Sequence, residues 1–367
     1  MADTEIEWAT KVWNFTRGCG RVSSGCVNCY AERQAIRHST RPGAPYAGLV
    51  KHHRDGPRWT GDVRFVAEKL AEPLHWKQPR DGSRHRIFVN SMSDLFHEGF
   101  TNEQIAAGFG VMAACPQHDF LILTKRAKRM REWFEWAHGD PLVAMTKALG
   151  EHGFGRDVIR RAAYREPRDQ AQSWPLPNVW LGCSAEDQQR ADERIPLLLQ
   201  CPAAVRWVSA EPLLGPIDFT RLGHNAVNRN ALTGMLDGPG GTTLTRDQVP
   251  GLDWIVVGGE SGPGARPCDV RWVRSIVRQC CDAGVPAFCK QLGAHVLDAN
   301  DTNYDGVDNQ EGLDAWPYGT EVEDFWNDPN RRHQGAAVRF LLDDRKGGEP
   351  EEWPSDLRVR EWPEVRA

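Results

Sequence analysis

Short apolar runs of strand length alternate with segments of helical periodicity along the first 290 residues of this chain. The apolar runs lie at residues 12–15, 86–90, 119–124, 178–182, 205–209, 254–258 and 286–290. Helical patterns lie at residues 102–114, with Thr101 as the expected N-cap, at 125–136 and 270–283, and one more ends near residue 199. Strands that alternate with helices pair in parallel, so the pattern predicts an α/β fold with a barrel-like sheet of about six to seven parallel strands.

The length of the chain suits one large domain with insertions and an appendage. Its 367 residues exceed what a single minimal core requires. We expect the barrel to occupy residues 1–294, with insertions near residues 139–177 and 222–250. Both insertions are rich in charged residues, proline or glycine, which predicts surface excursions or lids. Residues 295–367 form an acidic, tryptophan-containing extension that we expect to pack on the barrel.

Composition argues against a membrane or secreted protein. The net charge is −5, the hydrophobic content is 40%, and no apolar run approaches the length of a membrane span. The N-terminal residues lack the basic and apolar regions of a signal peptide. We therefore expect a cytoplasmic protein with reduced thiols and no membrane partner. Most cysteines outside the first 30 residues lie in apolar patterns and are expected in the core, namely Cys115, Cys183, Cys201, Cys268, Cys280, Cys281 and Cys289.

Polar residues recur at the carboxyl ends of the predicted strands. They are Asn90, Ser93, Asp94, Thr124, Lys125, Ser184, Glu186, Ser209, Glu211, Gly259, Glu260 and Lys290. In parallel α/β barrels this rim forms the active site. Turns are usually polar, so a single such residue would mean little, but repetition at six or seven strand ends favours a catalytic rim.

Three cysteines, Cys19, Cys26 and Cys29, lie in one short glycine-bearing loop after the first predicted strand. Three thiolates can bind three irons of a 4Fe-4S cluster and leave the fourth iron open, because no fourth cysteine lies nearby. Structural zinc is the second interpretation, since it usually takes four ligands and no histidine occurs before His38. Buried cysteines without a ligand are the third.

Two clusters of basic residues occur in an otherwise acidic chain. The first contains Arg33, Arg37, Arg41, Lys51, Arg54 and Arg58 with three histidines, and the second contains Lys125, Arg126, Lys128, Arg129 and Arg131. Such clusters can bind phosphates. Solvated helix faces are the alternative interpretation.

Taken together, the motifs resemble those of a phage-and-bacterial three-cysteine-motif family, related to the radical S-adenosylmethionine superfamily that includes spore photoproduct lyase. The residues that carry the resemblance are Ile6-Glu-Trp8, Trp13-Asn14, Gly18-Cys19, Val22-Ser23, Cys26-x-Asn-Cys29-Tyr30-Ala-Glu32, Asp94-Leu-Phe96, Leu123-Thr-Lys-Arg126, Trp180-Leu-Gly182, Ser209-Ala-Glu-Pro212 and Gly258-Gly-Glu-Ser-Gly262. They extend to about Lys290. The resemblance implies a partial TIM-type (β/α) barrel with a 4Fe-4S cluster at one mouth.

The resemblance also implies a chemistry. Cys19, Cys26 and Cys29 would ligate the cluster, and S-adenosylmethionine at the open iron would be cleaved to a 5′-deoxyadenosyl radical that abstracts hydrogen from the substrate. An electron donor such as flavodoxin or ferredoxin is then required. A lyase or modification enzyme acting on nucleic acid in repair or modification is the expected activity.

Further residues receive roles within this resemblance. Electrostatics suggests Lys125 or Arg126 for the methionine carboxylate and Glu186 or Asp94 for the ribose hydroxyls. Gly258 and Gly259 would allow close approach of the backbone to the cofactor. Two sets complete the candidates: Tyr30 joins the cofactor-binding residues, and Asp94, Glu211, Glu260 and Lys290 are the candidate catalytic residues.

The cysteine spacing departs from the superfamily's usual pattern. That pattern is Cys-x3-Cys-x2-Cys with an aromatic residue before the third cysteine. Here six residues separate Cys19 from Cys26, Asn28 precedes Cys29, and the aromatic Tyr30 follows it. The departure concerns how adenine would be stacked and whether cleavage of the cofactor is retained.

Two other classes of function compete with a radical enzyme. The first is a nucleic-acid-binding module in which a metal and the barrel serve only as scaffold. The second is a metal-independent hydrolase that uses rim carboxylates such as Asp94, Glu211 and Glu260. The sequence contains no Walker-type phosphate loop, HExxH zinc motif or GxSxG elbow, so those enzyme classes have no support.

Overall fold

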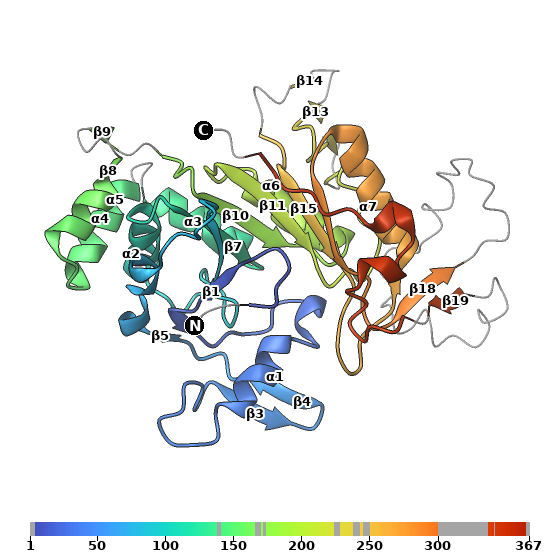
Figure 1. Cartoon of the computed structure of the whole chain (residues 1–367), viewed down its shortest axis with the longest axis horizontal. Coiled ribbons are helices and arrows are strands. Elements are labelled where there is room, and N and C mark those ends of the chain that lie inside the picture. Colours follow the sequence, from blue (N-terminus) through green and yellow to red (C-terminus); the bar gives the residue numbers. More distant parts are fainter. Residues whose placement is uncertain are drawn as a thin grey trace.

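The main sheet has seven parallel strands and curls into a half-barrel (Figure 1). The computed structural model describes residues 4–137, 141–165, 170–171, 174–223, 228–237, 243–244, 250–299, 337–340 and 342–364. In spatial order the strands are β1 (Lys11–Trp13), β6 (His85–Val89), β7 (His118–Thr124), β10 (Val179–Ser184), β11 (Val205–Ala210), β15 (Trp254–Gly258) and β17 (Ala287–Gln291). Every neighbouring pair is parallel. The predicted α/β class and parallel sheet are therefore confirmed, and β1 and β17 stand at the two ends of the sheet.

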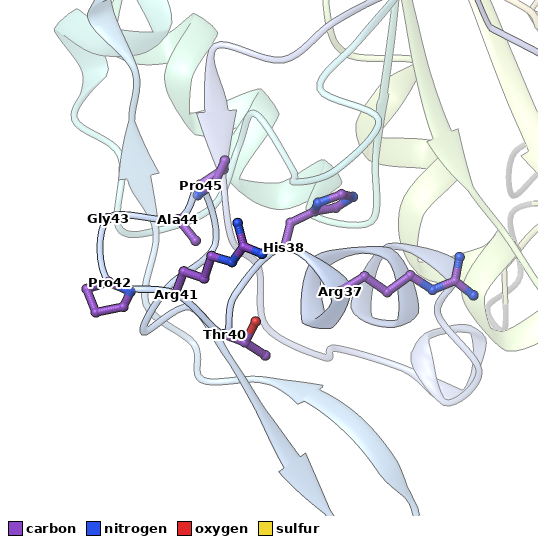
Figure 2. Close-up of a pocket in the computed structure, with 8 residues that line it drawn as sticks. All are labelled: Arg37, His38, Thr40, Arg41, Pro42, Gly43, Ala44 and Pro45. Carbon is purple, nitrogen blue, oxygen red and sulfur yellow. The ribbon is translucent and has the colours of Figure 1, made fainter.

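A small lobe is inserted between β1 and β6. It contains β2 (Thr16–Arg17), the 3-10 turn η1 (Ser24–Cys26), helix α1 (Tyr30–Arg37), β3 (Val50–His53), β4 (Gly56–Trp59) and β5 (Arg64–Phe65), and the turns η2 (Ala67–Lys69) and η3 (Glu72–His75) follow. Helix α1 packs on the β3–β4 hairpin through Ala35, Leu49 and Trp59. Figure 1 shows α1 and the hairpin projecting from the sheet, and Figure 2 shows a hollow beside the end of α1.

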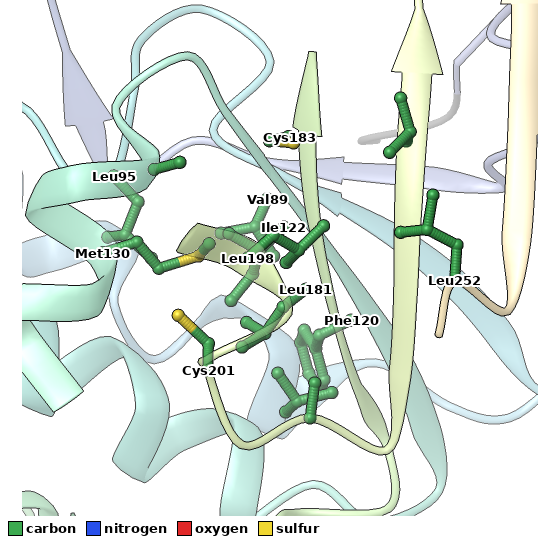
Figure 3. Packing of buried hydrophobic residues seen from close by; sticks show 14 of the residues in the cluster. Val89, Leu95, Phe120, Ile122, Met130, Leu181, Cys183, Leu198, Cys201 and Leu252 are labelled. Atoms are coloured by element: carbon green, nitrogen blue, oxygen red, sulfur yellow. The ribbon is translucent and has the colours of Figure 1, made fainter. Parts of the chain in front are cut away.

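Helices cover the outer face of the sheet. They are α2 (Asn102–Ala113), α3 (Ala127–Trp136), α6 (Gln188–Leu198) and α7 (Val270–Ala283). Figure 3 shows how Ile122 of β7 and Leu181 of β10 meet Met130 of α3 and Leu198 of α6 in a buried apolar layer. Because side chains alternate along a strand, these residues share one face of the sheet and leave the other face for the interior of the half-barrel.

Local signals in the sequence explain where these helices begin and end. Thr101 and Gln104 form a reciprocal capping box at the start of α2, which confirms the expected N-cap. Asp187 and Asp269 cap α6 and α7 by accepting a backbone N–H of the first turn. Gly284 ends α7 in a left-handed conformation with φ of 64°.

Aromatic side chains fill the concave face of the half-barrel. Trp207 of β11 and Trp254 of β15 lie 5.4 Å apart between ring centroids, and Trp8 from the N-terminal segment lies 5.3 Å from Trp207. Gly182 of β10 makes room for the Trp207 ring, since a Cβ at this glycine would lie 2.5 Å from the indole. The concave face near the amino ends of the strands is therefore packed core.

The first insertion is built differently from the expectation of a surface excursion or lid. Within 139–177, helices α4 (Pro141–Glu151) and α5 (Arg156–Ala163) are followed by the hairpin β8 (Tyr164–Arg165) and β9 (Gln170–Ala171). Met145 and Leu149 of α4 are fully buried, and Leu149 lies over Gly110 of α2, where a Cβ would be 2.8 Å away. The surface prediction is wrong for α4 and α5 because their apolar faces extend the core. Residues 139–140, 166–169 and 172–173 lie outside the described part.

The second insertion is described only in part. Within 222–250, β12 (Asn228–Arg229), β13 (Leu236–Asp237) and β14 (Thr243–Leu244) form a small antiparallel sheet. Residues 224–227, 238–242 and 245–249 lie outside the described residues, and so does the prediction of a surface excursion there.

The C-terminal segment returns to the end of the main sheet. A small sheet joins β16 (Cys268–Asp269), β18 (Val296–Ala299) and β19 (Ala337–Phe340), and the turns η5 (Pro350–Glu352) and η6 (Ser355–Leu357) follow. The Cys289 N–H donates to the Val359 carbonyl at 2.8 Å, and the Glu361 N–H donates to the Ala287 carbonyl at 2.8 Å. Residues 359–361 thus pair along the outer edge of β17, while residues 300–336 of the predicted extension lie outside the described part.

In the described part of the chain, none of the helices combines the length and the hydropathy that crossing a bilayer requires.

Candidate functional site

The cysteine loop lies at the carboxyl end of the sheet. Gly18 starts the loop with φ of +87° and lies where a Cβ would be 2.3 Å from the Asp62 carbonyl oxygen, so only glycine fits. Gly18 also forms a parallel bridge with Ser93, which follows β6. Cys29 ends the loop at the N-cap of α1. The predicted position of the loop on the barrel rim is confirmed.

Cys19, Cys26 and Cys29 are half-buried free thiols. The thiols of Cys19 and Cys29 lie close enough to interact electrostatically, and so do those of Cys26 and Cys29. Of the other cysteines, all are buried except Cys281, which is exposed on α7, so the expected core role holds for six of the seven.

Burial shifts the pKa of two of these thiols upward. Burial raises the pKa of Cys19 to about 12, although Arg126 opposes the shift. Burial likewise raises the pKa of Cys29, against two backbone N–H groups at the start of α1. A reactive nucleophilic cysteine needs a lowered pKa, so neither thiol has the environment of a catalytic nucleophile.

Arg126 connects the cysteine loop to the end of β7. Its guanidinium is buried, with one nitrogen 3.6 Å from the Cys19 sulfur and another donating to the Gly20 carbonyl at 3.1 Å. It also pairs with Asp94 at 3.1 Å and with Glu98 at 2.9 Å. Asp94 in turn accepts the hydroxyl of Thr124 at 2.7 Å and the backbone N–H of Lys125 at 3.1 Å.

Glu186, after β10, holds the middle of the loop. Its carboxylate is fully buried, accepts the Gly25 N–H at 3.1 Å and pairs with Arg194 at 2.9 Å. Burial alone would raise the pKa of Glu186, but Lys125 and Arg194 lower it overall, so the group is a carboxylate. Gly25 permits this approach, because a Cβ there would lie 2.9 Å from the carboxyl carbon of Glu186.

Glu260, after β15, holds the end of the loop. It accepts the Asn28 side-chain amide at 2.8 Å and pairs with Arg266 at 2.7 Å. Arg266 also donates to the Ser24 carbonyl at 2.9 Å. Burial would raise the pKa of Glu260, but Arg266 and Asn28 lower it overall. Residues from three strand ends therefore fix the backbone between the cysteines.

A second charged group lies elsewhere on the rim. Lys290 of β17 pairs with Glu211 at 3.1 Å, and the Ser209 hydroxyl donates to Glu211 at 3.1 Å. Burial would lower the pKa of Lys290, but Glu211 raises it overall, so the pair is ionic. Tyr30 is half-exposed, donates its hydroxyl to the Ser91 carbonyl and lies within electrostatic range of Glu211.

Two glycines bring the backbone of neighbouring strands close together. At Gly258 a Cβ would lie 2.7 Å from a carboxylate oxygen of Glu211, and at Gly259 it would lie 2.1 Å from the Leu292 carbonyl. Both glycines are thus required by contacts within the protein. Close packing within the protein therefore accounts for Gly258 and Gly259, which the sequence predicts to be cofactor-binding residues.

Some residues that build the site were not selected from the sequence. Arg194 and Arg266 neutralise Glu186 and Glu260, and Asn28 links the loop to Glu260. Arg194 lies two turns into α6, on the helix face toward the sheet, and that amphipathic position is the signal that could have identified it. Arg266 lies in an irregular loop, where no periodicity marks it.

In the described ranges no group of three or more His, Cys, Asp or Glu side chains is arranged to hold one metal ion. The cationic Arg126 lies 3.6 Å from the Cys19 sulfur, where it would stabilise a negatively charged thiolate.

Comparisons with known proteins bear on the family alone. No curated protein and no solved structure matches the chain. One family, described as proteins of unknown function (DUF5131), matches residues 3–343. Since this match covers the half-barrel, the cysteine loop and most of the rim, the chain belongs to the DUF5131 family.

Proposed function

We propose that this protein is an iron-sulfur enzyme of the radical S-adenosylmethionine type, in which Cys19, Cys26 and Cys29 hold a 4Fe-4S cluster. The observation that carries the proposal is a loop of three half-buried cysteines that residues at three strand ends hold in place. A pre-organised loop of this kind costs little reorganisation when the cluster binds.

The fold supports the proposal at a coarser level. We infer that the seven-stranded half-barrel is a partial TIM-type barrel, whose active site would lie at the carboxyl ends of the strands. The cysteine loop, Glu186, Glu211 and Glu260 all lie at those ends. The tryptophans that pack near the amino ends of the strands would exclude water from that side of the site.

The bound cofactor would supply a 5′-deoxyadenosyl radical that abstracts hydrogen from the substrate. Lys125 suits the methionine carboxylate better than Arg126 does, because the Arg126 guanidinium is already bound to Asp94, Glu98 and Gly20. Among the described residues the Lys125 ammonium has no hydrogen bond or ion pair, and it lies within electrostatic range of Glu186. Either Glu186 or Asp94 would face the ribose hydroxyls.

Other rim residues would serve the substrate. The ionic pair of Lys290 and Glu211 would hold or move a proton there, with Ser209 orienting the carboxylate. We place the reaction in the cytoplasm, with nucleic acid as substrate and a low-potential donor such as flavodoxin or ferredoxin supplying electrons.

The hydrolase alternative has less support. Each carboxylate proposed for it is paired with its own cation: Asp94 with Arg126, Glu211 with Lys290, and Glu260 with Arg266. A general acid needs a raised pKa, whereas Arg266 and Asn28 outweigh the effect of burial and lower the pKa of Glu260. The binding-module alternative is distinguished by experiment.

Anaerobic reconstitution tests the proposal directly. We expect about four irons and four sulfides per chain, and a reduced electron paramagnetic resonance spectrum that changes when S-adenosylmethionine is added. Cys19→Ser, Cys26→Ser and Cys29→Ser should lose iron and keep their fold, while Cys281→Ser, at the exposed cysteine of α7, should retain both. Stoichiometric zinc without an iron-sulfur signal would overturn the proposal and favour the binding module.

A further inference from the structure

We propose that the lobe formed by residues 30–60, here called the basic lobe, binds the phosphodiester backbone of a nucleic acid and positions it beside the cysteine loop. It comprises α1, the β3–β4 hairpin and the loop between them. The inference rests on the proposed function, for which it names the surface that receives the substrate.

Charge is distributed very unevenly between this lobe and the rest of the chain. The whole chain has 45 Lys and Arg residues against 50 Asp and Glu residues. Between residues 30 and 60 there are six Lys or Arg residues, three histidines and two carboxylates, the buried Glu32 and Asp55. A positive surface on an acidic protein attracts a polyanion locally without making the whole protein bind nucleic acid indiscriminately.

Most of these cations are available to a ligand. Arg37, Arg41, Lys51 and Arg54 are exposed, and in the described structure their side chains have no hydrogen bond or ion pair. Lys51, His52, His53 and Arg54 follow one another along β3 and into the turn, so the end of the hairpin is basic on both faces. The other two cations are engaged: Arg58 pairs with Asp55 at 2.8 Å, and Arg33 donates to the Asn28 carbonyl at 2.7 Å and the Pro263 carbonyl at 3.2 Å.

The second basic cluster of the sequence differs in this respect. Lys128 pairs with Glu132 and Arg131 with Glu135, one turn along α3 in each case. Arg129 donates to Asn102, and Arg126 is buried against Asp94. Most charges of the second cluster are therefore neutralised within the protein, as expected for a solvated helix face. The basic lobe is the stronger candidate for binding a polyanion.

The lobe is attached firmly to the cysteine loop. Helix α1 begins directly after Cys29, and Glu32 in its first turn is buried. Glu32 accepts the Arg21 guanidinium at 3.1 Å and the Trp59 N–H at 2.9 Å, so one carboxylate joins the loop, the helix and the hairpin. A nucleic acid bound to the lobe would therefore lie at a fixed position relative to the three cysteines.

A hollow on the lobe offers a place for a phosphate. It has a volume of about 570 Å³ and is lined by residues 37–38 and 40–45, including Arg37, His38 and Arg41 (Figure 2). Figure 2 shows Arg37 extending away from the loop that carries Arg41, so the two guanidiniums can reach different phosphates of one strand. The hairpin presents no exposed aliphatic or aromatic side chain for insertion into a bilayer, which favours nucleic acid over an anionic membrane.

Fluorescence anisotropy with labelled single-stranded and duplex oligonucleotides tests the inference on the metal-free protein. The lobe variant is Lys51→Glu with Arg54→Glu, at the exposed end of the hairpin. The matched control is Lys128→Glu with Lys147→Glu, whose side chains are 77% and 73% exposed on α3 and α4. We expect the lobe variant to bind the oligonucleotides about 10- to 100-fold more weakly than wild type. The slope of log affinity against log salt concentration should decrease by the equivalent of about two phosphate contacts. The control should keep nearly the wild-type affinity.

Equal losses in the lobe variant and the control would overturn the inference, as would unchanged binding in the lobe variant. Equal competition by anionic phospholipid vesicles would also overturn it, because the surface would then serve a membrane. If the lobe variant is misfolded by circular dichroism, Arg37→Gln with Arg41→Gln gives the same test without altering the hairpin. Binding is measured without iron, so failure of cluster assembly and failure of the lobe are observed separately.

Discussion

At the scale of single residues, glycines allow the backbone of the site to lie directly against buried carboxylates. The Gly25 N–H reaches Glu186, and Gly258 lies against Glu211. Each carboxylate is matched by a cation, Arg194 for Glu186 and Lys290 for Glu211. The rim is therefore rigid before any ligand binds.

Gly25→Ala tests this rigidity. The new Cβ would lie 2.9 Å from the Glu186 carboxyl carbon, so the loop that carries Cys26 must shift. We expect reconstituted protein to lose at least half of its iron during a chelator challenge that wild type resists, with little change in its melting temperature. Gly150→Ala is the control, because its nearest contact is an Ile159 methyl carbon at 3.9 Å. Equal iron retention in both variants would contradict the proposed role of Gly25.

His118 makes the folded state sensitive to acid. Burial, followed by the nearby His85, lowers the pKa of His118 from 6.5 to about 4. One ring nitrogen lies 3.2 Å from the Trp76 carbonyl and the other has no partner in the described structure, so a second proton would have no acceptor. Between pH 6.5 and 4 the unfolded chain binds the proton and the folded chain does not, so stability falls as pH falls through this window.

The expected size of this effect is about 2 kcal/mol between pH 7 and pH 5. His118→Gln keeps a polar side chain and removes the titration, so its unfolding free energy should depend less on pH over that interval. Urea titrations at the two pH values measure the difference. The exposed His53→Gln is the control and should keep the wild-type dependence.

At the scale of elements, the sequence predicted most of the main sheet. All seven apolar runs form strands, because a strand buried on both faces is apolar along its whole length. The polar residues that follow these strands meet at one rim, as parallel pairing requires. Helices α4 and α5 were predicted as surface excursions because segment 139–177 as a whole is charged, rich in arginine and interrupted by prolines, and only packing on α2 shows that their apolar faces are buried.

The partners of the rim carboxylates could not be predicted from the sequence. Arg266 pairs with Glu260 from an irregular loop, and Arg126 turns from the predicted cofactor contact toward Asp94 and the Gly20 carbonyl. Such pairings depend on the final positions of strand ends that lie far apart in the chain. From the sequence, the two basic clusters were equally plausible phosphate-binding surfaces. The ion pairs along α3, which neutralise charges of the second cluster, distinguish them.

Gly182 tests the packing between two strands. A Cβ there would lie 2.5 Å from the Trp207 ring, which neighbouring tryptophans hold in place. Gly182→Ala should lower the unfolding free energy by about 1–3 kcal/mol, the usual cost of overpacking a core. Urea denaturation measures the loss. Gly215→Ala, with its nearest contact at 3.8 Å, should remain within about 0.5 kcal/mol of wild type.

At the scale of the whole molecule, the chain ends complete the core. Trp8 from the N-terminal segment and Trp362 from the C-terminal segment both pack in the concave aromatic cluster. Leu357 is fully buried in the outer core beside α7. The barrel and residues 342–364 should therefore unfold together.

Leu357→Ala tests this cooperativity. Removing a fully buried leucine should cost about 2–5 kcal/mol, and the single unfolding transition should shift as a whole. Val143→Ala, at a side chain that is 64% exposed, is the control. The expectation fails if the wild-type protein shows two transitions and Leu357→Ala affects only the earlier one. The segment would then be an independent appendage.

The unclosed sheet has a consequence for the kind of molecule the rim can serve. A closed barrel surrounds its bore with strands on every side, so a long polymer must offer a free end or a fully extruded unit. Because the sheet runs from β1 to β17 without joining, the strands that the structure describes form no ring around the rim. A target in the middle of an unbroken polymer can then be laid across the mouth from the side, without threading.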